Sequence, residues 1–290
     1  MLYVILVNYN GADDTIECIE SLSLQRARDF EIIVVDNNST DNSVERLKKI
    51  SVHIILLVNE ENLGFSGGNN VGIKYAIEHG AEGVILLNND TVVSSDFIDS
   101  YKRTVNKHHN SAVIGPKIKY YYQDNIIWYA GGEYNGKTGR VEHTGYKCID
   151  KGEYDTFKEV SFISGCCIYI PTSVIKRIGF LDERYFLYCE DLEYCCRLQR
   201  NKIKMFYDPQ IVVLHKVSAS TDKISGSSIY YTVRNGLYVI KEYHNKGTSL
   251  LPYLYYICQA LFRCIKGEYR FKPVLNGIID MVSGKVGKKG

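Results

Sequence analysis

The amino-acid sequence predicts an α/β protein with a mostly parallel sheet flanked by helices, added antiparallel strands and a C-terminal helical extension. In roughly the first hundred residues, short apolar runs alternate with segments of helical spacing, which is typical of βαβ units. Aromatic and β-branched runs broken by glycine follow, and they favour antiparallel hairpins. Residues 229–282 then show helical periodicity. We therefore expect a main domain over residues 1–222 and an extension over 223–290 that is suited to membrane association or oligomerisation.

Composition and charge limit the classes of function. The chain has 290 residues, of which 45% are hydrophobic and 23% charged, so it can bury a sizeable core. A net charge of +2 does not favour a nucleic-acid partner. The nine cysteines include no C-x-x-C pair, which is typical of reduced, buried thiols in a cytosolic protein rather than of a disulfide framework or a zinc site.

Two stretches of the sequence indicate how the protein relates to membranes: its N-terminal run and its most apolar segment near the C-terminus. An apolar run begins at residue 2 without a basic segment before it, so we expect no signal peptide. Residues 250–265 are interrupted by Pro252, Gln259 and Arg263, which makes them too short and too polar to cross a bilayer. Aromatic and basic residues mix there as in interfacial helices, with core packing as the alternative. We expect a cytoplasmic protein, or one peripheral on the inner face of the plasma membrane.

Polar residues follow the strands of the expected parallel half. Residues 8–11 follow the first strand, 36–41 follow the second, and 88–90 follow the fourth. Ligands of open parallel sheets bind beyond the carboxyl ends of the strands, so we expect a site there. The strands are expected at residues 2–7, 30–35, 52–58 and 83–87, and the helices at 12–24, 42–50 and 69–78.

Asn88, Asn89 and Asp90 directly follow the apolar run V-I-L-L. A carboxylate in this position can hold a divalent cation, and the cation can hold phosphates. The alternative is an Asn/Asp turn without a function. A dinucleotide site is disfavoured, because the first turn reads Asn8-Tyr9-Asn10-Gly11 and lacks G-x-G-x-x-G.

A glycine-bearing segment at residues 62–70 precedes the third expected helix. Its glycines allow close approach of a ligand, and a helix N-terminus beyond it would suit a phosphate or a sugar. The alternative is an ordinary surface loop. No Lys-Ser/Thr follows, so the segment is not a Walker motif.

The second half of the main domain carries aromatic and acidic residues. Trp128 could stack on a sugar ring or pack in a sheet. Residues 136–155 are polar and glycine-rich, which indicates a long excursion. Strands are expected at residues 112–117, 126–134, 160–171, 204–208 and 211–214, and helices at 96–106, 172–178, 229–243, 250–266 and 273–282.

Glu190 and Asp191 stand at the start of a segment of helical spacing, directly after the apolar run F-L-Y-C. Such surroundings can desolvate one acid and raise its pKa toward the range of a general base. The alternative is that both acids only favour the helix dipole. His215 ends the last expected strand and could be a metal ligand or a satisfied polar residue.

Taken in order, several motifs resemble those of the inverting glycosyltransferase family 2, which has the GT-A fold. The likeness spans nearly the whole chain and points to rhamnosyltransferase-like members that build bacterial surface polysaccharides. The motifs are V-V-D-N-N-S-T-D, E-N-L-G-F-S-G-G-N-N, L-L-N-N-D-T, S-G-C-C-I-Y-I-P, F-L-Y-C-E-D-L-E-Y-C-C-R and the strand that ends at His215.

The resemblance implies transfer of a sugar, rhamnose favoured, from a dTDP- or UDP-linked donor to a hydroxyl of a glycan or polyprenyl-linked acceptor. It also implies a divalent cation, Mg²⁺ or Mn²⁺, and it is compatible with a homo-oligomer. Asp36 would accept a hydrogen bond from the pyrimidine N3–H. The residues that would bind the nucleotide sugar are Val7, Asn8, Tyr9, Asp36, Asn38, Gly68, Asn69, Asn88, Asn89 and Asp90.

By the same resemblance, Asp90 would ligate the cation and His215 would be a second contact to the metal or phosphate. Asp191 would be the catalytic base, with Glu190 as the less favoured candidate. Asn88 departs from the family's D-x-D pattern, because it is an amide where many relatives have an acid. One charge fewer should weaken metal binding.

Two other functions remain open on the sequence. A nucleotidyltransferase also uses a parallel sheet and a carboxylate-bound cation, but the turn at residues 8–11 lacks the basic residues that hold a triphosphate. A degenerate transferase could bind a nucleotide sugar and dock partners without turnover. Asn88 favours that alternative, whereas Glu190, Asp191 and His215 argue against it.

Overall fold

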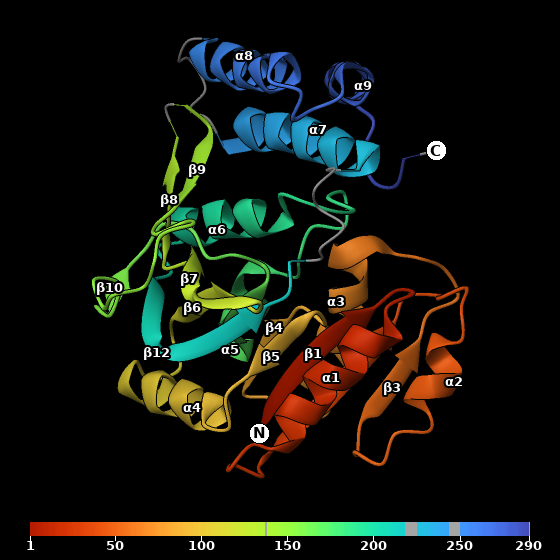
Figure 1. Cartoon of the computed structure of the whole chain (residues 1–290), viewed down its shortest axis with the longest axis vertical. Coiled ribbons are helices and arrows are strands. Elements are labelled where there is room, and N and C mark those ends of the chain that lie inside the picture. The colour runs from red at the N-terminus through yellow and green to blue at the C-terminus, as the bar shows by residue number, and fades with distance from the viewer. Residues whose placement is uncertain (137, 218–224, 244–249, 290) are drawn as a thin grey trace.

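The computed structural model describes residues 1–136, 138–217, 225–243 and 250–289, and it confirms the expected α/β class. A large mixed sheet with flanking helices forms most of the molecule, and helices of the C-terminal region stack at one end of it (Figure 1). The sheet order is β10-β12-β6-β11-β4-β1-β2-β3, while β5 pairs with β12 and β7 with β6. The expected boundary between residues 222 and 223 lies outside the described residues, so the division into two domains stays a prediction.

The parallel half follows from its apolar, β-branched runs. β1 and β2 are parallel in a register that places Asn8 opposite Asp36, and β4 and β3 extend this parallel set on either side. Most residues of β1, β2 and β4 are buried, as continuous apolar runs require. The strands are β1 (Leu2–Asn8), β2 (Phe30–Asp36), β3 (Ile55–Val58) and β4 (Gly83–Leu87), with helices α1 (Ala12–Ser23), α2 (Ser43–Leu47) and α3 (Gly64–Glu78).

Helix α3 begins five residues earlier than expected. The segment predicted as a glycine-bearing loop is the first part of the helix, which starts at Gly64 with φ +73°. A Cβ at Gly68 would lie 2.9 Å from Val7 Cγ1, and one at Gly72 would lie 2.6 Å from Ile5 Cγ2. These glycines therefore let α3 pack closely on β1, and the prediction of a helix start at Asn69 is wrong.

The second half of the sheet is mixed. β11 (Cys167–Pro171) runs antiparallel to both β4 and β6, and β12 (Met205–His215) is parallel to β6 (Val113–Tyr120). The hairpin of β8 and β9 forms a separate sheet. The remaining elements are β5 (Thr91–Val93), β7 (Gln123–Tyr129), β8 (Gly132–Asn135), β9 (Arg140–His143), β10 (Lys158–Glu159), α4 (Phe97–Lys107), α5 (Thr172–Ile178) and α6 (Glu190–Arg200).

Four predicted strands in this half are corrected. The run 126–134 is divided at Gly131, whose φ of +92° separates β7 from β8. Of residues 160–171, only Cys167–Pro171 form a strand. The two short strands predicted at 204–208 and 211–214 are one strand, β12, whose register against β6 shifts between Asp208 and Val212.

The C-terminal region is helical, as expected. It comprises α7 (Gly226–Tyr243), α8 (Leu251–Ile265) and α9 (Phe271–Val282), and α8 and α9 both lie against α7 (Figure 1). A Cβ at Gly277 would lie 2.9 Å from the carbonyl oxygen of Tyr230, so α9 packs closely on α7. Within the described ranges, no helix is long and apolar enough to span a membrane.

Candidate active site

A buried hydrogen-bond network joins the carboxyl ends of the parallel strands. Asn8 Nδ2 at the end of β1 donates to Asp36 Oδ2 at the end of β2, at 2.7 Å. Asn8 Oδ1 accepts from Thr15 Oγ1 at 2.8 Å, and this hydroxyl accepts from Asn89 Nδ2 at 2.8 Å. The polar residues that follow β1, β2 and β4 are therefore fixed relative to one another, as the parallel arrangement predicts.

The network buries some of the expected nucleotide-binding residues. Asn8 and Asp36 have no exposed surface, and the Asp36 carboxylate also accepts from the backbone N–H and the hydroxyl of Ser39, at 2.9 and 2.7 Å. Gly68 and Asn69 lie inside α3, where Asn69 Nδ2 donates to the carbonyl of Phe65 at 2.9 Å. These residues form the floor of the strand-end site rather than its surface.

Other expected donor-binding residues face solvent. The Tyr9 side chain is 49% exposed, and Asn38 is exposed with a left-handed φ of 62°. Val7, Asn88 and Asn89 are partly exposed at the same edge. A planar aromatic side chain and amides at the rim of a polar site are suited to the base and ribose of a nucleotide.

Asp90 and His215 come together from distant parts of the chain. Asp90 follows β4 and His215 ends β12, and Asp90 Oδ1 lies 3.1 Å from His215 Nε2. Burial opposes ionisation of Asp90, but the hydrogen bond and charge of His215 prevail and lower the pKa of the Asp90 carboxyl below 3.8. His215 Nδ1 is buried and has no hydrogen-bond partner among the described residues.

This pair fits a divalent cation. The Asp90 carboxylate supplies the kind of oxygen ligand that Mg²⁺ and Mn²⁺ prefer, and the neutral imidazole of His215 beside it could join as a ligand of a transition metal. No third His, Cys, Asp or Glu joins them in the part of the chain that the structure describes. The remaining coordination positions would therefore fall to water and to oxygens of a bound substrate.

Asp191 and Glu190 open helix α6 in different surroundings. Asp191 Oδ2 accepts from the Gly165 backbone N–H at 2.9 Å, and Oδ1 accepts from the Leu192 N–H at 2.8 Å. Burial nevertheless raises the pKa of Asp191 above 3.8. Glu190 is buried, and its Oε2 has no hydrogen-bond partner in the described chain. Burial, and then the charge of Asp191, raise the pKa of Glu190 well above 4.5, so Asp191 ionises first.

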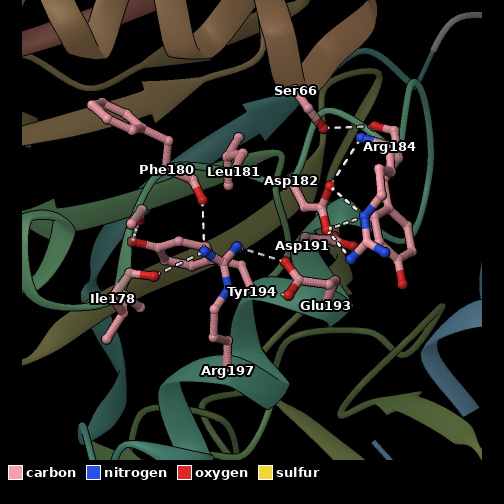
Figure 2. A network of polar contacts seen from close by, with 12 residues as sticks. Ser66, Ile178, Phe180, Leu181, Asp182, Arg184, Asp191, Glu193, Tyr194 and Arg197 are labelled. Atoms are coloured by element: carbon pink, nitrogen blue, oxygen red, sulfur yellow. Dashed lines mark hydrogen bonds and ion pairs between the residues drawn. The ribbon is translucent and has the colours of Figure 1, made fainter. Parts of the chain in front are cut away.

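Polar contacts fix the orientation of α6. Figure 2 shows the Arg197 guanidinium between the Glu193 carboxylate and the carbonyl groups of Ile178 and Phe180. Its Nη2 lies 2.6 Å from Glu193, and its Nη1 donates to the two carbonyl oxygens at 3.0 and 2.7 Å. The hydroxyl of Tyr243 on α7 also donates to Glu193, at 2.5 Å. These contacts hold the helix that carries Asp191 against the end of α5 and the segment after it, and against α7.

The segment before α6 connects this helix to the start of α3 and to α7. The Phe65 N–H in α3 donates to the Phe186 carbonyl at 2.8 Å, and Asn235 on α7 donates to the carbonyls of Leu187 and Tyr188 at 2.9 Å each. Tyr188 and Cys189 then adopt left-handed φ values of 65° and 67°. This turn directs the chain into α6 and places Asp191 beside Gly165.

A cavity of about 660 Å³ lies beside Asp191, between the β8–β9 hairpin, the start of α6 and the helices α7 and α8. Trp128 lines it and also contacts His215, with ring centroids 4.9 Å apart and perpendicular planes. Asp191 therefore lines the cavity directly, whereas the Asp90–His215 pair is connected to it through Trp128. Its aromatic and basic lining residues are Trp128, His143, Tyr146, Phe162, Tyr188, Tyr256, Tyr269, Arg140 and Arg263.

Residues 3–179 match the model of the glycosyl transferase family 2, which is more than half of the chain. The chain belongs to this family. Glycosyl transfer from a nucleotide sugar, as the motifs imply, is thereby confirmed as the class of activity, and the nucleotidyltransferase alternative is not supported.

Curated relatives align along most of this family 2 chain. It is 26% identical over 302 residues to the low-salt glycan biosynthesis hexosyltransferase Agl10 of Haloferax volcanii, covering 99% of the chain and 92% of the relative. It is 25% identical to the dTDP-rhamnosyl transferase RfbF of Shigella flexneri, covering 99% and 97%. It is 24% identical to the N-acetylglucosaminyl-diphospho-decaprenol L-rhamnosyltransferase of Mycobacterium tuberculosis, covering 79% and 80%.

Solved structures confirm the GT-A fold. The crystal structure of GalNAc-T7 with UDP, GalNAc and Mn²⁺ matches with a TM-score of 0.67 at 15% identity, covering 98% of this chain and 58% of that one. The mannosyltransferase PcManGT from Pyrobaculum calidifontis, in complex with GDP-Man and Mn²⁺, matches with a TM-score of 0.60 at 12% identity, covering 98% and 74%. Divalent cations are thus present in structures that share the fold.

The structure adds residues to the candidate site that the motifs alone did not single out. Asn37 is buried, and its amide bonds to Asn59, Asn62, Leu63 and Gly64, which ties the end of β2 to the start of α3. Thr15 joins β1 to the loop after β4. Asn37 stands inside the motif V-V-D-N-N, so its polar character was a signal. Thr15 gave no such signal, because its role depends on the pairing of distant strands.

Proposed function

We propose that this glycosyltransferase moves a sugar, rhamnose favoured, from a nucleoside-diphosphate donor to an acceptor hydroxyl with inversion of the anomeric centre. One observation carries the proposal. The Asp191 carboxylate, fixed by the N–H groups of Gly165 and Leu192, borders a cavity whose Trp128 also contacts the His215–Asp90 pair. The candidate base therefore lines the cavity, and Trp128 connects this cavity to the candidate phosphate-binding centre, so that two substrates could meet there.

The donor would bind at the strand ends. Tyr9 and Val7 would contact the base, Asn38 the ribose, and Asn88 and Asn89 the sugar or the diphosphate, and their exposure at the strand ends supports these roles. Asp36 and Asn8 would support these contacts from below, since their side chains already bond to each other. The name of the RfbF relative supports a dTDP-linked rhamnose donor, and UDP is the alternative nucleotide.

Asp191 would act as the general base. Each of its oxygens accepts one backbone N–H and keeps a further lone pair for an acceptor hydroxyl. The acceptor oxygen would attack the anomeric carbon as its proton passes to Asp191, while the bond to the diphosphate breaks on the opposite side. Such base assistance is typically worth about 10²–10⁴ in rate.

Asp90 and His215 would hold a Mg²⁺ or Mn²⁺ ion together with the donor diphosphate. The bound cation would neutralise negative charge on the leaving diphosphate. Asn88 supplies an amide where a second carboxylate would strengthen this binding. We therefore expect the nucleotide and the cation to bind cooperatively, with weak binding of the cation alone.

The acceptor would occupy the cavity beside Asp191. Its aromatic lining suits stacking on sugar rings, and Arg140 and Arg263 on opposite walls suit an anionic group. A relative named for an acceptor of the N-acetylglucosaminyl-diphospho-lipid type supports a polyprenyl-linked acceptor. The diphosphate of such an acceptor would supply the anion.

The first test is calorimetric titration of the protein with dTDP and with UDP, each with and without Mn²⁺. We expect the cation to tighten binding of one nucleotide, and Asp90→Ala to remove that gain. Asp124→Ala is the matched control, because Asp124 is exposed on β7 and has no part in the site. Absence of binding for both nucleotides under every condition would overturn the donor assignment.

A turnover assay distinguishes an active transferase from a family member that binds a nucleotide sugar without catalysis. A degenerate family member would bind the nucleotide sugar and dock partners, but it would release no nucleoside diphosphate. Incubation with dTDP-rhamnose and a lipid-diphospho-sugar acceptor should give a glycosylated product and one equivalent of dTDP. Donor binding without any product, across nucleotide sugars and acceptors, would support the partner role.

A further inference from the structure

We propose that the outer faces of α8 and α9 form a docking surface for an anionic lipid bilayer. The surface consists of two apolar stripes, here called the C-terminal stripes. On α8 they comprise Leu251, Leu254, Tyr255, Cys258, Phe262 and Ile265, and on α9 Phe271, Leu275, Ile279 and Val282. Only one part of this inference rests on the proposed function: the claim that docking brings the acceptor cavity close to the lipid surface.

The stripe on α8 has strict helical spacing. Apart from the adjacent Leu254 and Tyr255, its members recur at intervals of three and four residues, so they share one side of the helix, and all are exposed. Ile265 is 83% exposed and Leu251 is 66% exposed. The opposite side is occupied, because Ala260 is buried and the Tyr256 hydroxyl donates to the Thr232 carbonyl on α7 at 3.0 Å. Packing among the residues that the structure describes therefore does not explain the exposure of Leu254, Phe262 and Ile265.

The stripe on α9 has the same character. Phe271, Leu275 and Val282 lie on one side of the helix, and Val282 is 78% exposed. The other side packs on α7 through Val274 and Gly277. Two neighbouring helices thus hold their apolar residues away from the core. Exposed apolar side chains that repeat along two helices in contact with each other indicate an interaction site rather than scattered surface residues.

Charge favours an anionic lipid surface over a second copy of the chain. Residues 263–289 carry seven basic and two acidic side chains, although the whole chain has a net charge of only +2. Lys266, Arg270 and Lys272, at the junction of the stripes, have no acidic partner among the described residues, whereas Lys285 pairs with Asp280. Like charges would repel across a self-interface, but basic residues beside apolar helices attract anionic lipids.

The position of the cavity agrees with docking of the protein on a membrane through α8. Gln259, Ala260 and Arg263 line the cavity from the inner side of α8, while Phe262 and Ile265 face outward from the same helix. Docking through α8 would therefore hold the cavity next to the headgroups. An acceptor with a lipid tail could enter it without leaving the bilayer.

The experiment is sedimentation of the full chain with vesicles of phosphatidylcholine alone and with phosphatidylglycerol added. We expect binding to the anionic vesicles that falls about tenfold or more when salt rises from low to high concentration. The double variant Phe262→Glu, Ile265→Glu should lower the partition coefficient roughly a hundredfold. Leu24→Glu is the matched control, since Leu24 is 70% exposed on the parallel half, and it should bind as the unmodified chain does.

Three results would overturn the proposal. The first is that the unmodified chain binds neither kind of vesicle, and the second is that Leu24→Glu loses as much vesicle binding as the double variant. The third is that the double variant converts a dimer to a monomer but binds vesicles as before. The last result would assign the stripes to a second copy of the chain. Circular dichroism and calorimetric nucleotide binding of the double variant serve as separate readouts. They report the fold and the donor site, so failure of the docking proposal is distinguishable from failure of the proposed function.

Discussion

Two adjacent carboxyl groups at the start of α6 differ in what surrounds them. Asp191 accepts two backbone N–H bonds at the edge of the cavity, whereas Glu190 is buried with one oxygen unpartnered. The hydrogen bonds stabilise the charged form of Asp191, and its charge in turn disfavours a second charge on Glu190. The pKa of Glu190 is therefore raised further above its usual range than the pKa of Asp191, which makes Asp191 the acid that ionises first.

Asp191→Asn tests which acid is the base. The amide keeps the shape of the side chain but cannot take a proton, so we expect kcat to fall about 10²–10⁴-fold while donor affinity is unchanged. Steady-state kinetics and nucleotide titration measure the two quantities. Glu190→Gln is the matched control and should keep most of the activity. The opposite pattern would make Glu190 the base.

Glu190→Gln should also change how stability depends on pH. The raised pKa means that the stability gained from neutral Glu190 is fully present below its unfolded-state pKa near 4.5 and is lost as pH rises toward the folded-state pKa. A neutral glutamine removes that loss. Thermal melts should therefore show similar Tm values for both proteins near pH 4.5 and a higher Tm for the variant near pH 8. Equal differences at both pH values would contradict the buried, protonated state.

For single residues, the sequence indicated which side chains carry chemistry, but not which of them contact each other or which are buried. The motifs pointed to Asp90, His215 and Asp191, and the structure places Asp90 beside His215. The same motifs did not distinguish Asn8, which is buried below the site, from Tyr9, which is exposed at its rim. Burial depends on which strands become neighbours, and local sequence does not encode that choice.

At the scale of single elements, glycines set how closely α3 approaches the sheet. The sequence showed a cluster of glycines, which we interpreted as a loop for a ligand. In the structure Gly68 and Gly72 face β1 from within the helix. Low helix propensity argued against this placement, but tertiary packing outweighs propensity when two backbones must come close. The strands of the parallel half were predictable, because a continuous apolar run has few other environments.

Gly72→Val tests the close approach of α3. Its side chain would meet Ile5 Cγ2, which lies 2.6 Å from the position of the first added carbon. We expect the free energy of unfolding to fall by about 1–3 kcal/mol, as overpacking does in other cores. Chemical denaturation measures it. Glu78→Ala, on the exposed end of the same helix, should stay within about 0.5 kcal/mol of the unmodified protein.

At the scale of the whole molecule, the cavity depends on the C-terminal helices. Tyr256 and Arg263 of α8 form one wall, while Asp191 and Trp128 belong to the sheet-bearing part of the chain. The sequence predicted helices in this region but not their contribution to a site, since that depends on how α8 lies against α7. The helical extension is therefore part of the candidate acceptor site.

Gly236→Val tests this dependence. A Cβ at Gly236 would lie 2.1 Å from the Tyr256 hydroxyl, so a larger side chain must displace Tyr256 and the wall that it forms. We expect the acceptor KM to rise roughly ten- to hundredfold, because small misplacements of binding groups are costly. Donor affinity should not change. Lys241→Ala, at the exposed end of α7 and outside the cavity lining, is the control and should leave both constants as they were.

The order of the site along the chain has a consequence for evolution. Apart from His215, the residues assigned to the donor precede Thr91, whereas Asp191 and the cavity lining follow Ile127. A recombination event within α4, at residues 97–107, would join the donor half of one relative to the acceptor half of another. Such chimeras should inherit their nucleotide sugar from one parent and their acceptor from the other. New surface glycans could thus arise by reshuffling two halves, without a new active site.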